Sequence, residues 1–308
     1  MKKILIIGGS GFIGTNLSKE LLKKNKYEIF SLDLQMPRVI DDNIHYICGN
    51  FFDDDLIHDA IADKDYIIHA ISTINPGNSN EKYIQGYEKD FIYTMRLCSY
   101  LIGKKTKMVF LSSGGTVYGN HDIQPLNEEI LPRPINHYGN IKLCIENTLR
   151  AFNYQMHNKM IIARISNPYG IGQDFHKGVG FIDAVLKRCI NGEEIEIWGD
   201  GNNMRDYIYI EDACKMIIRL LDYEGKYDTF NISSGIGVTQ NEIIDIVRRM
   251  GLTPRVIHKP QRTVDVRKII LDNSRIREIY KEEIVPLKQG INQYYEYLLK
   301  MKVESEND

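Results

Sequence analysis

The sequence predicts an α/β fold in which a doubly wound parallel sheet is followed by a smaller C-terminal domain. Short apolar runs alternate with longer amphipathic segments through the first half of the chain, which is typical of parallel strands covered by helices on both faces. A glycine-rich turn over residues 8–14 joins the first apolar run to the first amphipathic segment. With 308 residues and 43% hydrophobic content, the chain can bury a large core.

Apolar runs of strand length predict the sheet in chain order. They lie at 4–7, 28–32, 66–71, 108–112 and 160–165, with helices expected near 12–24, 82–103 and 138–157. The second half predicts a helix at 181–191, a strand at 195–198, a strand and helix over 207–222, a strand at 228–233 and a helix at 239–250. We therefore expect a first domain over 1–170 and a second over 171–308, with the chain returning to the first around 205–235.

Composition and charge exclude several classes of protein. The net charge is −2 and no long block of Lys or Arg occurs, so the broad positive field of a nucleic-acid binder is missing. The five cysteines lie far apart without zinc-ligand spacing, so we expect reduced thiols and no metal. No apolar run approaches the roughly 18–20 residues that cross a bilayer. The first strand leaves no room for a signal peptide before it, and we expect a cytoplasmic protein.

The glycine-rich turn predicts a dinucleotide site. It follows a strand and opens a helix, where a pyrophosphate can approach the backbone and lie at the positive end of the helix. The residues expected to contact the cofactor are Gly8, Gly11, Phe12, Ile13 and Gly14. Asp33 ends the next strand, where its carboxylate can accept hydrogen bonds from a ribose diol and would repel a 2′-phosphate. We therefore expect NAD rather than NADP.

Tyr138 and Lys142 are the candidate catalytic pair. A spacing of four puts the phenol and the ammonium on one face of the helix expected over 138–157. A tyrosine that acts as a base near neutral pH must lower its pKa from about 10 by about 2–3 units. A nearby lysine and a positive nicotinamide ring can supply that change in a shielded cleft. The pair therefore predicts a tyrosine base beside the dinucleotide.

Further motifs follow along the chain. They are Ser-Ser-Gly-Gly-Thr-Val-Tyr-Gly (112–119), Arg-Ile-Ser-Asn-Pro-Tyr-Gly (164–170), Trp-Gly-Asp-Gly (198–201) and Arg-Asp-Tyr-Ile (205–208). With the glycine turn and the Tyr138–Lys142 pair, they make nearly the whole chain resemble the extended short-chain dehydrogenase/reductase superfamily, specifically the NAD-dependent nucleotide-sugar epimerase/dehydratase family. The resemblance implies a Rossmann-like fold and Tyr138 as acid/base on a sugar hydroxyl. It also implies that Lys142 lowers the pKa of Tyr138 and holds the nicotinamide ribose.

One position departs from the family's pattern. The family places a catalytic Ser or Thr three residues before the Val-Tyr pair, and this chain has Gly114 there. Thr116, two residues further along an extended segment, would point to the same face and is the expected substitute, with Ser113 as second choice. Loss of one positioned donor can cost orders of magnitude in rate, so either a neighbour replaces it or the enzyme is slow.

The same segment bears on the reaction. Family members that dehydrate the sugar have Asp-Glu directly after the catalytic Thr, and here Gly115 and Thr116 follow Gly114, which disfavours a dehydratase and also a decarboxylase. Two reactions remain, 4-epimerisation and reduction of a 4-keto sugar. Epimerisation returns the hydride to the sugar and can retain its cofactor, so the expected preference for NAD favours a 4-epimerase. A catalytically weak NAD-binding sensor is the alternative from another class.

The resemblance also implies how a nucleotide sugar is held. Arg205 and Arg262 lie in segments similar to the family's pyrophosphate-binding arginines, and a planar guanidinium suits phosphate oxygens. Asn167 matches an asparagine beside the diphosphate, and Trp198 takes the place of an aromatic ring near the uracil. We therefore expect a UDP-hexose substrate, in sugar interconversion or surface polysaccharide synthesis.

Apolar residues recur at helical spacing in the two long helices expected at 82–103 and 138–157. Examples are Phe91, Met95, Leu149 and Phe152. The equivalent helices of the family form a dimeric four-helix bundle, so the resemblance implies a homodimer. Burial in the protein's own core is the competing explanation.

Overall fold

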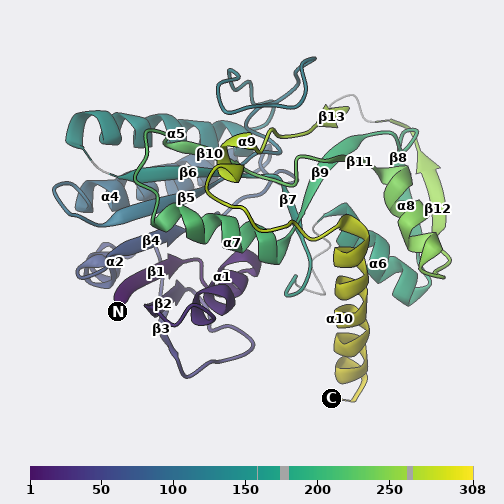
Figure 1. Ribbon diagram of the computed structural model, residues 1–308, viewed down its shortest axis with the longest axis horizontal. Helices are drawn as coiled ribbons and strands as arrows, with labels where there is room; N and C mark the ends of the chain where they lie inside the picture. The colour runs from purple at the N-terminus through teal and green to yellow at the C-terminus, as the bar shows by residue number, and fades with distance from the viewer. Residues whose placement is uncertain (158, 174–179, 262–265, 308) are drawn as a thin grey trace.

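The computed structural model describes residues 1–157, 159–173, 180–261 and 266–307. Its centre is a seven-stranded sheet with the strand order β10-β6-β5-β4-β1-β2-β3, in which every neighbouring pair is parallel (Figure 1). The strands are β1 (Lys2–Ile7), β2 (Tyr27–Asp33), β3 (Ile44–Cys48), β4 (Tyr66–His69), β5 (Lys107–Ser113), β6 (Met160–Ile165) and β10 (Thr229–Ile232). The predicted doubly wound α/β fold is confirmed.

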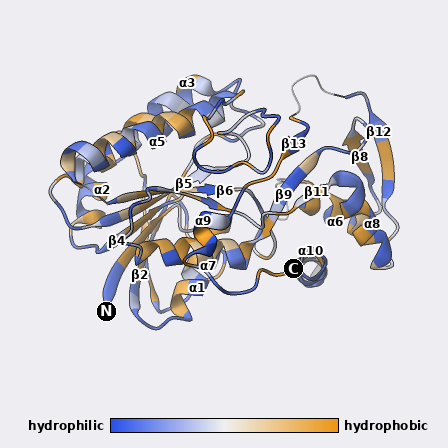
Figure 2. Ribbon diagram, turned by 45° about the horizontal axis from the view of Figure 1, so that its top comes forward, coloured by the Kyte–Doolittle hydropathy of each residue, from blue (hydrophilic) through white to orange (hydrophobic). Residues whose placement is uncertain are grey.

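Helices cover both faces of this sheet (Figure 1). One face packs against α1 (Phe12–Leu22) and α7 (Ile210–Leu221), and the other against α2 (Asp54–Ile61), α4 (Tyr93–Tyr100) and α5 (His137–Met156). Residues 4–7 of β1 supply the two cores alternately and are fully buried, which explains why this run is continuously apolar. In Figure 2 the helices carry hydrophobic and hydrophilic residues side by side, as expected for elements with one buried face.

The second half of the chain builds a smaller layer with its own core, on the right of Figure 1. It contains β7 (Asn167–Tyr169), α6 (Phe181–Asn191), β8 (Glu194–Trp198), β9 (Met204–Tyr209), β11 (Gly237–Thr239), α8 (Gln240–Arg249), β12 (Arg255–Lys259), β13 (Lys268–Ile269) and α10 (Leu287–Asn307). Helix α9 (Ser274–Arg277) packs against β10 of the large sheet instead. Strand β9 pairs with β7, β11 and β13, and β8 pairs with β12. Between them the chain returns to the large sheet, where β10 pairs with β6.

Two local differences from the sequence-based expectations bear on the site. The helix expected over 82–103 is three consecutive pieces: α3 (Tyr83–Gln85), the π-helix η1 (Gly86–Ile92) and α4, which ends at Tyr100. The strand expected over 66–71 ends at His69, so residues 70–74 form a loop at the carboxyl end of β4. No helix among the described residues is both long and apolar enough to cross a bilayer.

The four apolar residues that suggested dimer helices pack inside this chain. Leu149 is fully buried, and Phe91, Met95 and Phe152 are partly buried against the same core. Their contacts support the competing explanation, core burial.

Candidate active site

The glycine turn has the geometry that a bound pyrophosphate requires. Gly8 has a φ of +87°, a conformation that favours glycine, and a Cβ on Gly14 would lie 2.3 Å from the carbonyl oxygen of Gly8. Helix α1 begins at Phe12, after the N-cap residue Gly11, which has no side chain to cap the helix, and the first turn contains no acidic residue. The first backbone N–H groups of the helix therefore meet no competing carboxylate and fit an anion.

Asp33 lies at the carboxyl end of β2, beside this turn. Its carboxylate accepts hydrogen bonds from the backbone N–H of Ser10 at 3.0 Å and of Leu34 at 2.7 Å. A carboxylate has about four acceptor positions, so these two bonds leave capacity for the hydroxyls of a ribose. The turn and Asp33 together fit a dinucleotide without a 2′-phosphate.

Tyr138 and Lys142 lie in the first turns of α5, as expected. The helix begins after Asn136, whose side chain accepts the N–H of Gly139 at 2.8 Å. The ammonium of Lys142 is buried, lies 5.6 Å from the centre of the Tyr138 ring and donates to the carbonyl of Leu111 at 3.1 Å. Lys142 therefore places a positive charge beside the phenol and is fixed to β5.

The expected fall in the pKa of Tyr138 is not found in the protein alone. Burial, and to a smaller extent the negative charge of Asp90, raise the pKa of Tyr138 to about 12. Burial also lowers the pKa of Lys142 to about 8, against the opposing effects of Asp90 and Glu146. The expected fall depends on a positive nicotinamide ring as well as on Lys142, so it stays a prediction for the protein with NAD bound, and burial and the charge of Asp90 act against it.

The hydroxyl groups near Gly114 form a pair. Thr116 Oγ1 donates to Ser113 Oγ at 2.9 Å, so both candidate residues lie together. A Cβ on Gly139, next to Tyr138, would lie 2.5 Å from the carbonyl oxygen of Thr116, which places this pair against the start of α5. Leu271 explains the missing side chain at Gly114, because a Cβ there would lie 2.3 Å from its Cδ1.

A cavity of about 300 Å³ brings together three of the four residues expected to hold the substrate. Asn167, Trp198 and Arg205 all line it, while Arg262 lies outside the described residues. The side-chain amide of Asn167 donates to the carbonyl of Asp206 at 2.8 Å. The Oδ1 of Asn167 lies 3.8 Å from the position that a Cβ would take if Gly115 had a side chain. The cavity therefore adjoins the Ser113–Thr116 pair.

The cavity also has polar residues that the sequence analysis missed. Asn203 Oδ1 and Gln240 Oε1 are buried oxygens that have no hydrogen-bond partner in the part of the chain that the structure describes. Nothing in their local sequence distinguishes them, because Gln240 reaches the cavity only through the packing of α8 against α6. Side-chain amides can both donate to and accept from a ligand, so the two residues offer a polar edge beside Trp198.

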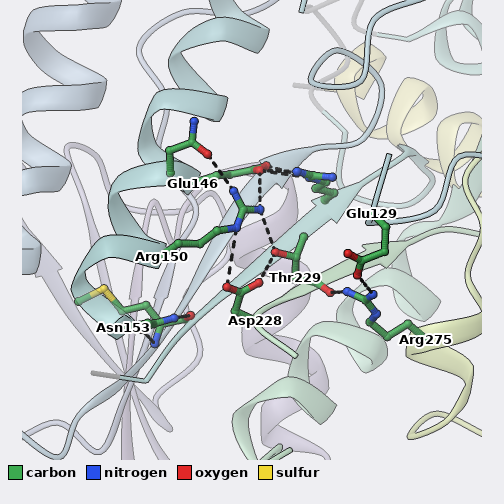
Figure 3. Close-up of polar contacts among 10 residues, drawn as sticks. Glu129, Glu146, Arg150, Asn153, Asp228, Thr229 and Arg275 are labelled. Atoms are coloured by element: carbon green, nitrogen blue, oxygen red, sulfur yellow. Dashed lines mark hydrogen bonds and ion pairs between the residues drawn. The ribbon is translucent and has the colours of Figure 1, made fainter. Parts of the chain in front are cut away.

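The helix that carries Tyr138 and Lys142 is held to the sheet by a buried charge network (Figure 3). Glu146, one turn after Lys142, is fully buried and accepts from Arg164 at 2.6 Å and from Ser112 at 2.6 Å. Arg150 contacts Glu146 at 3.3 Å and also Thr229 at 3.0 Å on β10. Helical spacing from Lys142 could have indicated Glu146, since positions 138, 142 and 146 share one face.

Asp90 is a second buried carboxylate that the sequence analysis missed. It lies in η1, is 5% exposed and accepts from Ser72 Oγ at 2.6 Å and from the N–H of Thr73 at 2.8 Å. Ser72 and Thr73 belong to the loop after β4. This loop lies against the glycine turn, because a Cβ added to Gly8 would be 3.0 Å from the backbone nitrogen of Ile71. Asp90 therefore connects the loop beside the glycine turn with the helix layer around Tyr138.

Comparisons with known proteins identify the family of the chain. Residues 4–233 match the sequence model of the NAD dependent epimerase/dehydratase family. The chain is 28% identical over 301 residues to a putative UDP-glucose 4-epimerase of Methanocaldococcus jannaschii, covering 96% of this chain and 98% of that protein. It is 30% identical over 259 residues to the dTDP-4-dehydro-6-deoxyglucose reductase of Escherichia coli, covering 79% of this chain and 80% of that protein.

A solved structure shows the same architecture. The crystal structure of a UDP-glucose 4-epimerase of Thermotoga maritima with UDP-glucose superimposes with a TM-score of 0.91 at 29% identity, covering 97% of this chain and 99% of that chain. The family match spans most of the chain, and the glycine turn with Asp33 fits the cofactor that the family uses. The chain therefore belongs to the NAD-dependent epimerase/dehydratase family, and it is an enzyme whose cofactor is NAD.

Proposed function

We propose that the protein is a nucleotide-sugar 4-epimerase that interconverts UDP-hexoses, UDP-glucose with UDP-galactose or their N-acetyl forms. The observation that carries the proposal is that the candidate catalytic pair, the loop with the two hydroxyl groups and the cavity lie next to one another. The Tyr138–Lys142 pair lies against the loop that bears Ser113 and Thr116, and this loop adjoins the cavity lined by Asn167. The M. jannaschii and T. maritima relatives bear the name UDP-glucose 4-epimerase, which supports the same reaction.

In this proposal Tyr138 carries the proton of the sugar. Its phenol oxygen accepts the proton of the 4-hydroxyl as C4 is oxidised and gives it back after the 4-keto sugar has turned in the pocket. The Ser113–Thr116 pair donates a hydrogen bond to the reacting oxygen, with Thr116 in the role that the family gives to the position of Gly114. Lys142 stabilises the phenolate. The chemistry supplied by bound NAD is reversible hydride acceptance together with a positive charge near the phenol.

The cavity residues hold the nucleotide in this proposal. Arg205 and Asn167 bind the diphosphate, and Trp198 stacks on the base. Arg262 remains a predicted second phosphate ligand. We assign residues 1–170 mainly to NAD and 171–308 mainly to the substrate.

Reduction of a 4-keto sugar is the second candidate function. It needs the same tyrosine, hydroxyl and cofactor, and the 30% identity to the E. coli reductase favours it over other members of the family. A reductase consumes one reduced cofactor per sugar, whereas an epimerase regenerates its cofactor.

The test is incubation of the purified protein with each of the four UDP-hexoses, with catalytic NAD and no reductant. Interconversion of a C4 pair, resolved by chromatography, would establish the epimerase and name the sugar. Tyr138→Phe should bind NAD and lose turnover, whereas Tyr154→Phe, an 85% exposed tyrosine on the same helix, should keep it. No conversion, with stoichiometric loss of NADH on a 4-keto sugar, would replace the epimerase by the reductase. NAD binding without turnover on either class of substrate would favour the sensor.

We also infer a homodimer formed through the outer surfaces of α3, η1 and α5. Ile84, Ile92, Tyr154 and Met156 are exposed apolar residues on these elements. Sedimentation equilibrium of the wild type and of Ile92→Asp tests the inference, since the variant should be monomeric.

A further inference from the structure

We propose that Lys187 is a positioning residue of the substrate cavity, which acts through Asp183. Its ammonium offsets the negative charge of Asp183 in the cavity wall and so allows the cavity to hold a diphosphate. The proposal rests on the function proposed above, in which Arg205 and Asn167 bind the diphosphate. It adds to that site a buried charge pair on helix α6.

The described residues that line the cavity include two charged ones, and these have opposite signs. Arg205 lies on β9, and Asp183 lies in the first turn of α6. A diphosphate is an anion, so the guanidinium attracts it and the carboxylate repels it. The cavity of about 300 Å³ has the volume of a sphere about 8 Å across, which is about the distance over which physiological salt screens a charge. Both charges therefore act on an anion inside the cavity.

Asp183 is fully buried, and its two carboxylate oxygens have different partners. Lys187, one turn further along α6, contacts Oδ2 at 2.8 Å, and the phenol of Tyr294 on α10 donates to Oδ1. A neighbouring ammonium favours the ionised carboxylate, and so does the positive end of the helix dipole in the first turn. Asp183 therefore places a negative charge in the wall of the cavity.

Lys187 is itself buried, with 7% of its surface exposed. An ammonium and a carboxylate 2.8 Å apart form a pair without net charge, and their opposite effects on a more distant anion largely cancel. The net charge that the described residues present to the cavity is then the positive charge of Arg205. Without Lys187, the charge of Asp183 would oppose that of Arg205.

The packing around the pair does not require charges. Helices α6 and α10 share an apolar core that contains Ile182, Val185, Ile291 and Leu298. Replacement of a buried ion pair by apolar residues of similar size is often neutral or stabilising. The contribution of the pair to stability therefore does not explain its place beside the cavity, whereas an effect on an anionic ligand does.

Loss of the ammonium should weaken the binding of charged ligands selectively. Lys187→Met keeps an unbranched side chain and leaves the charge of Asp183 without this partner. At about 8 Å and an effective dielectric constant of about 20, one added negative charge weakens the binding of a monovalent anion about 30-fold before screening by salt. With screening, we expect about a tenfold loss for UDP, which carries more than one charge. Uridine lacks the phosphates, and its affinity should change little.

The experiment measures the dissociation constants of UDP and uridine for the NAD-loaded protein by ligand-observed NMR titration. In Lys187→Met the affinity for UDP should fall about tenfold relative to that for uridine. Lys187→Arg keeps both charges, and the double variant Asp183→Asn/Lys187→Met removes both, so each should keep the wild-type ratio. Tyr294→Phe is a matched control, because it removes a contact of the same carboxylate without removing its charge. It should also leave the ratio unchanged.

Two outcomes would overturn the proposal. Equal losses for UDP and uridine in Lys187→Met, or no loss for UDP, would reduce the pair to a structural contact of α6. A double variant with the same low ratio as Lys187→Met would show that the charge of Asp183 is not the cause. If Lys187→Met does not fold, Asp183→Asn decides, because its affinity for UDP relative to uridine should rise, and an unchanged ratio would refute the proposal.

The titrations need no turnover, so they separate this proposal from the proposed reaction. A selective loss of UDP binding in a protein that interconverts no UDP-hexose would refute the epimerase and leave the role of Lys187 standing. An unchanged ratio in an active epimerase would refute only the role of Lys187.

Discussion

Gly114→Ser restores the family's hydroxyl position and tests how the structure explains its loss. The added Cβ would lie 2.3 Å from Leu271 Cδ1, more than 1 Å inside the normal carbon–carbon contact of about 3.5–4.0 Å. Leu271 is fully buried in a cluster with Tyr118, Leu126 and Ile269, so a shift of its side chain must disturb the packing of these neighbours. We expect Gly114→Ser to lower the free energy of unfolding by about 1–3 kcal/mol, as overpacking does.

A double-mutant cycle isolates this contact. Leu271→Ala alone should cost about 2–5 kcal/mol because it leaves a cavity. In the double variant the serine side chain occupies part of that cavity and the clash is gone. The double variant should therefore be more stable than the sum of the single effects predicts, by about 1 kcal/mol or more.

Urea denaturation of the four proteins measures the cycle. Gly115→Ser is a matched control, since its Cβ would have only ordinary contacts, the nearest at 3.8 Å, and should change stability little. Effects that add within about 0.5 kcal/mol would refute the reasoning. So would a Gly114→Ser variant as stable as the wild type.

Three further variants test other parts of the site. Gly14→Ala should abolish NAD binding in calorimetry, because its Cβ meets the backbone at 2.3 Å; micromolar binding would contradict the assigned turn. Glu146→Ala should lower the free energy of unfolding in urea by about 3–5 kcal/mol, because Arg164 stays buried without its partner; a loss below about 1 kcal/mol would contradict the network. Trp198→Ala should weaken UDP binding by about 1–3 kcal/mol through lost stacking, and unchanged affinity would remove Trp198 from the base site.

Hydrophobic periodicity explains which parts of the fold could be predicted. The inner strands are continuously apolar because they are buried on both faces, and the runs at 4–7 and 160–165 lie inside β1 and β6. The edge strand β3 was missed because only Ile44 of its five residues is buried. The π-helix was also missed, since an apolar pattern indicates a helix but not its hydrogen-bond register.

The site was predictable where the chemistry lies within one motif. Tyr138 and Lys142 share a helix face by spacing alone, and the glycine turn needs only a preceding strand. Asp90 could not be found in this way, because its relation to Lys142 depends on the packing of η1 against α5. The pKa of Tyr138 depends also on burial and on the charge of Asp90, and the spacing of the pair reveals neither of them.

The return of the chain to the large sheet limits how parts of this protein can be exchanged with those of its relatives. Strand β10 supplies the outer partner of β6, with bonds from Ile162 N to Asp228 O and from Ser166 N to Ile232 O. A fragment that stopped at residue 170 would leave that row of backbone groups open, a template for pairing with other chains. It would also lose α7, which covers one face of the sheet. The second half of the chain therefore cannot be transplanted between relatives at a single junction, because the exchanged segment would include β10, the strand that completes the large sheet.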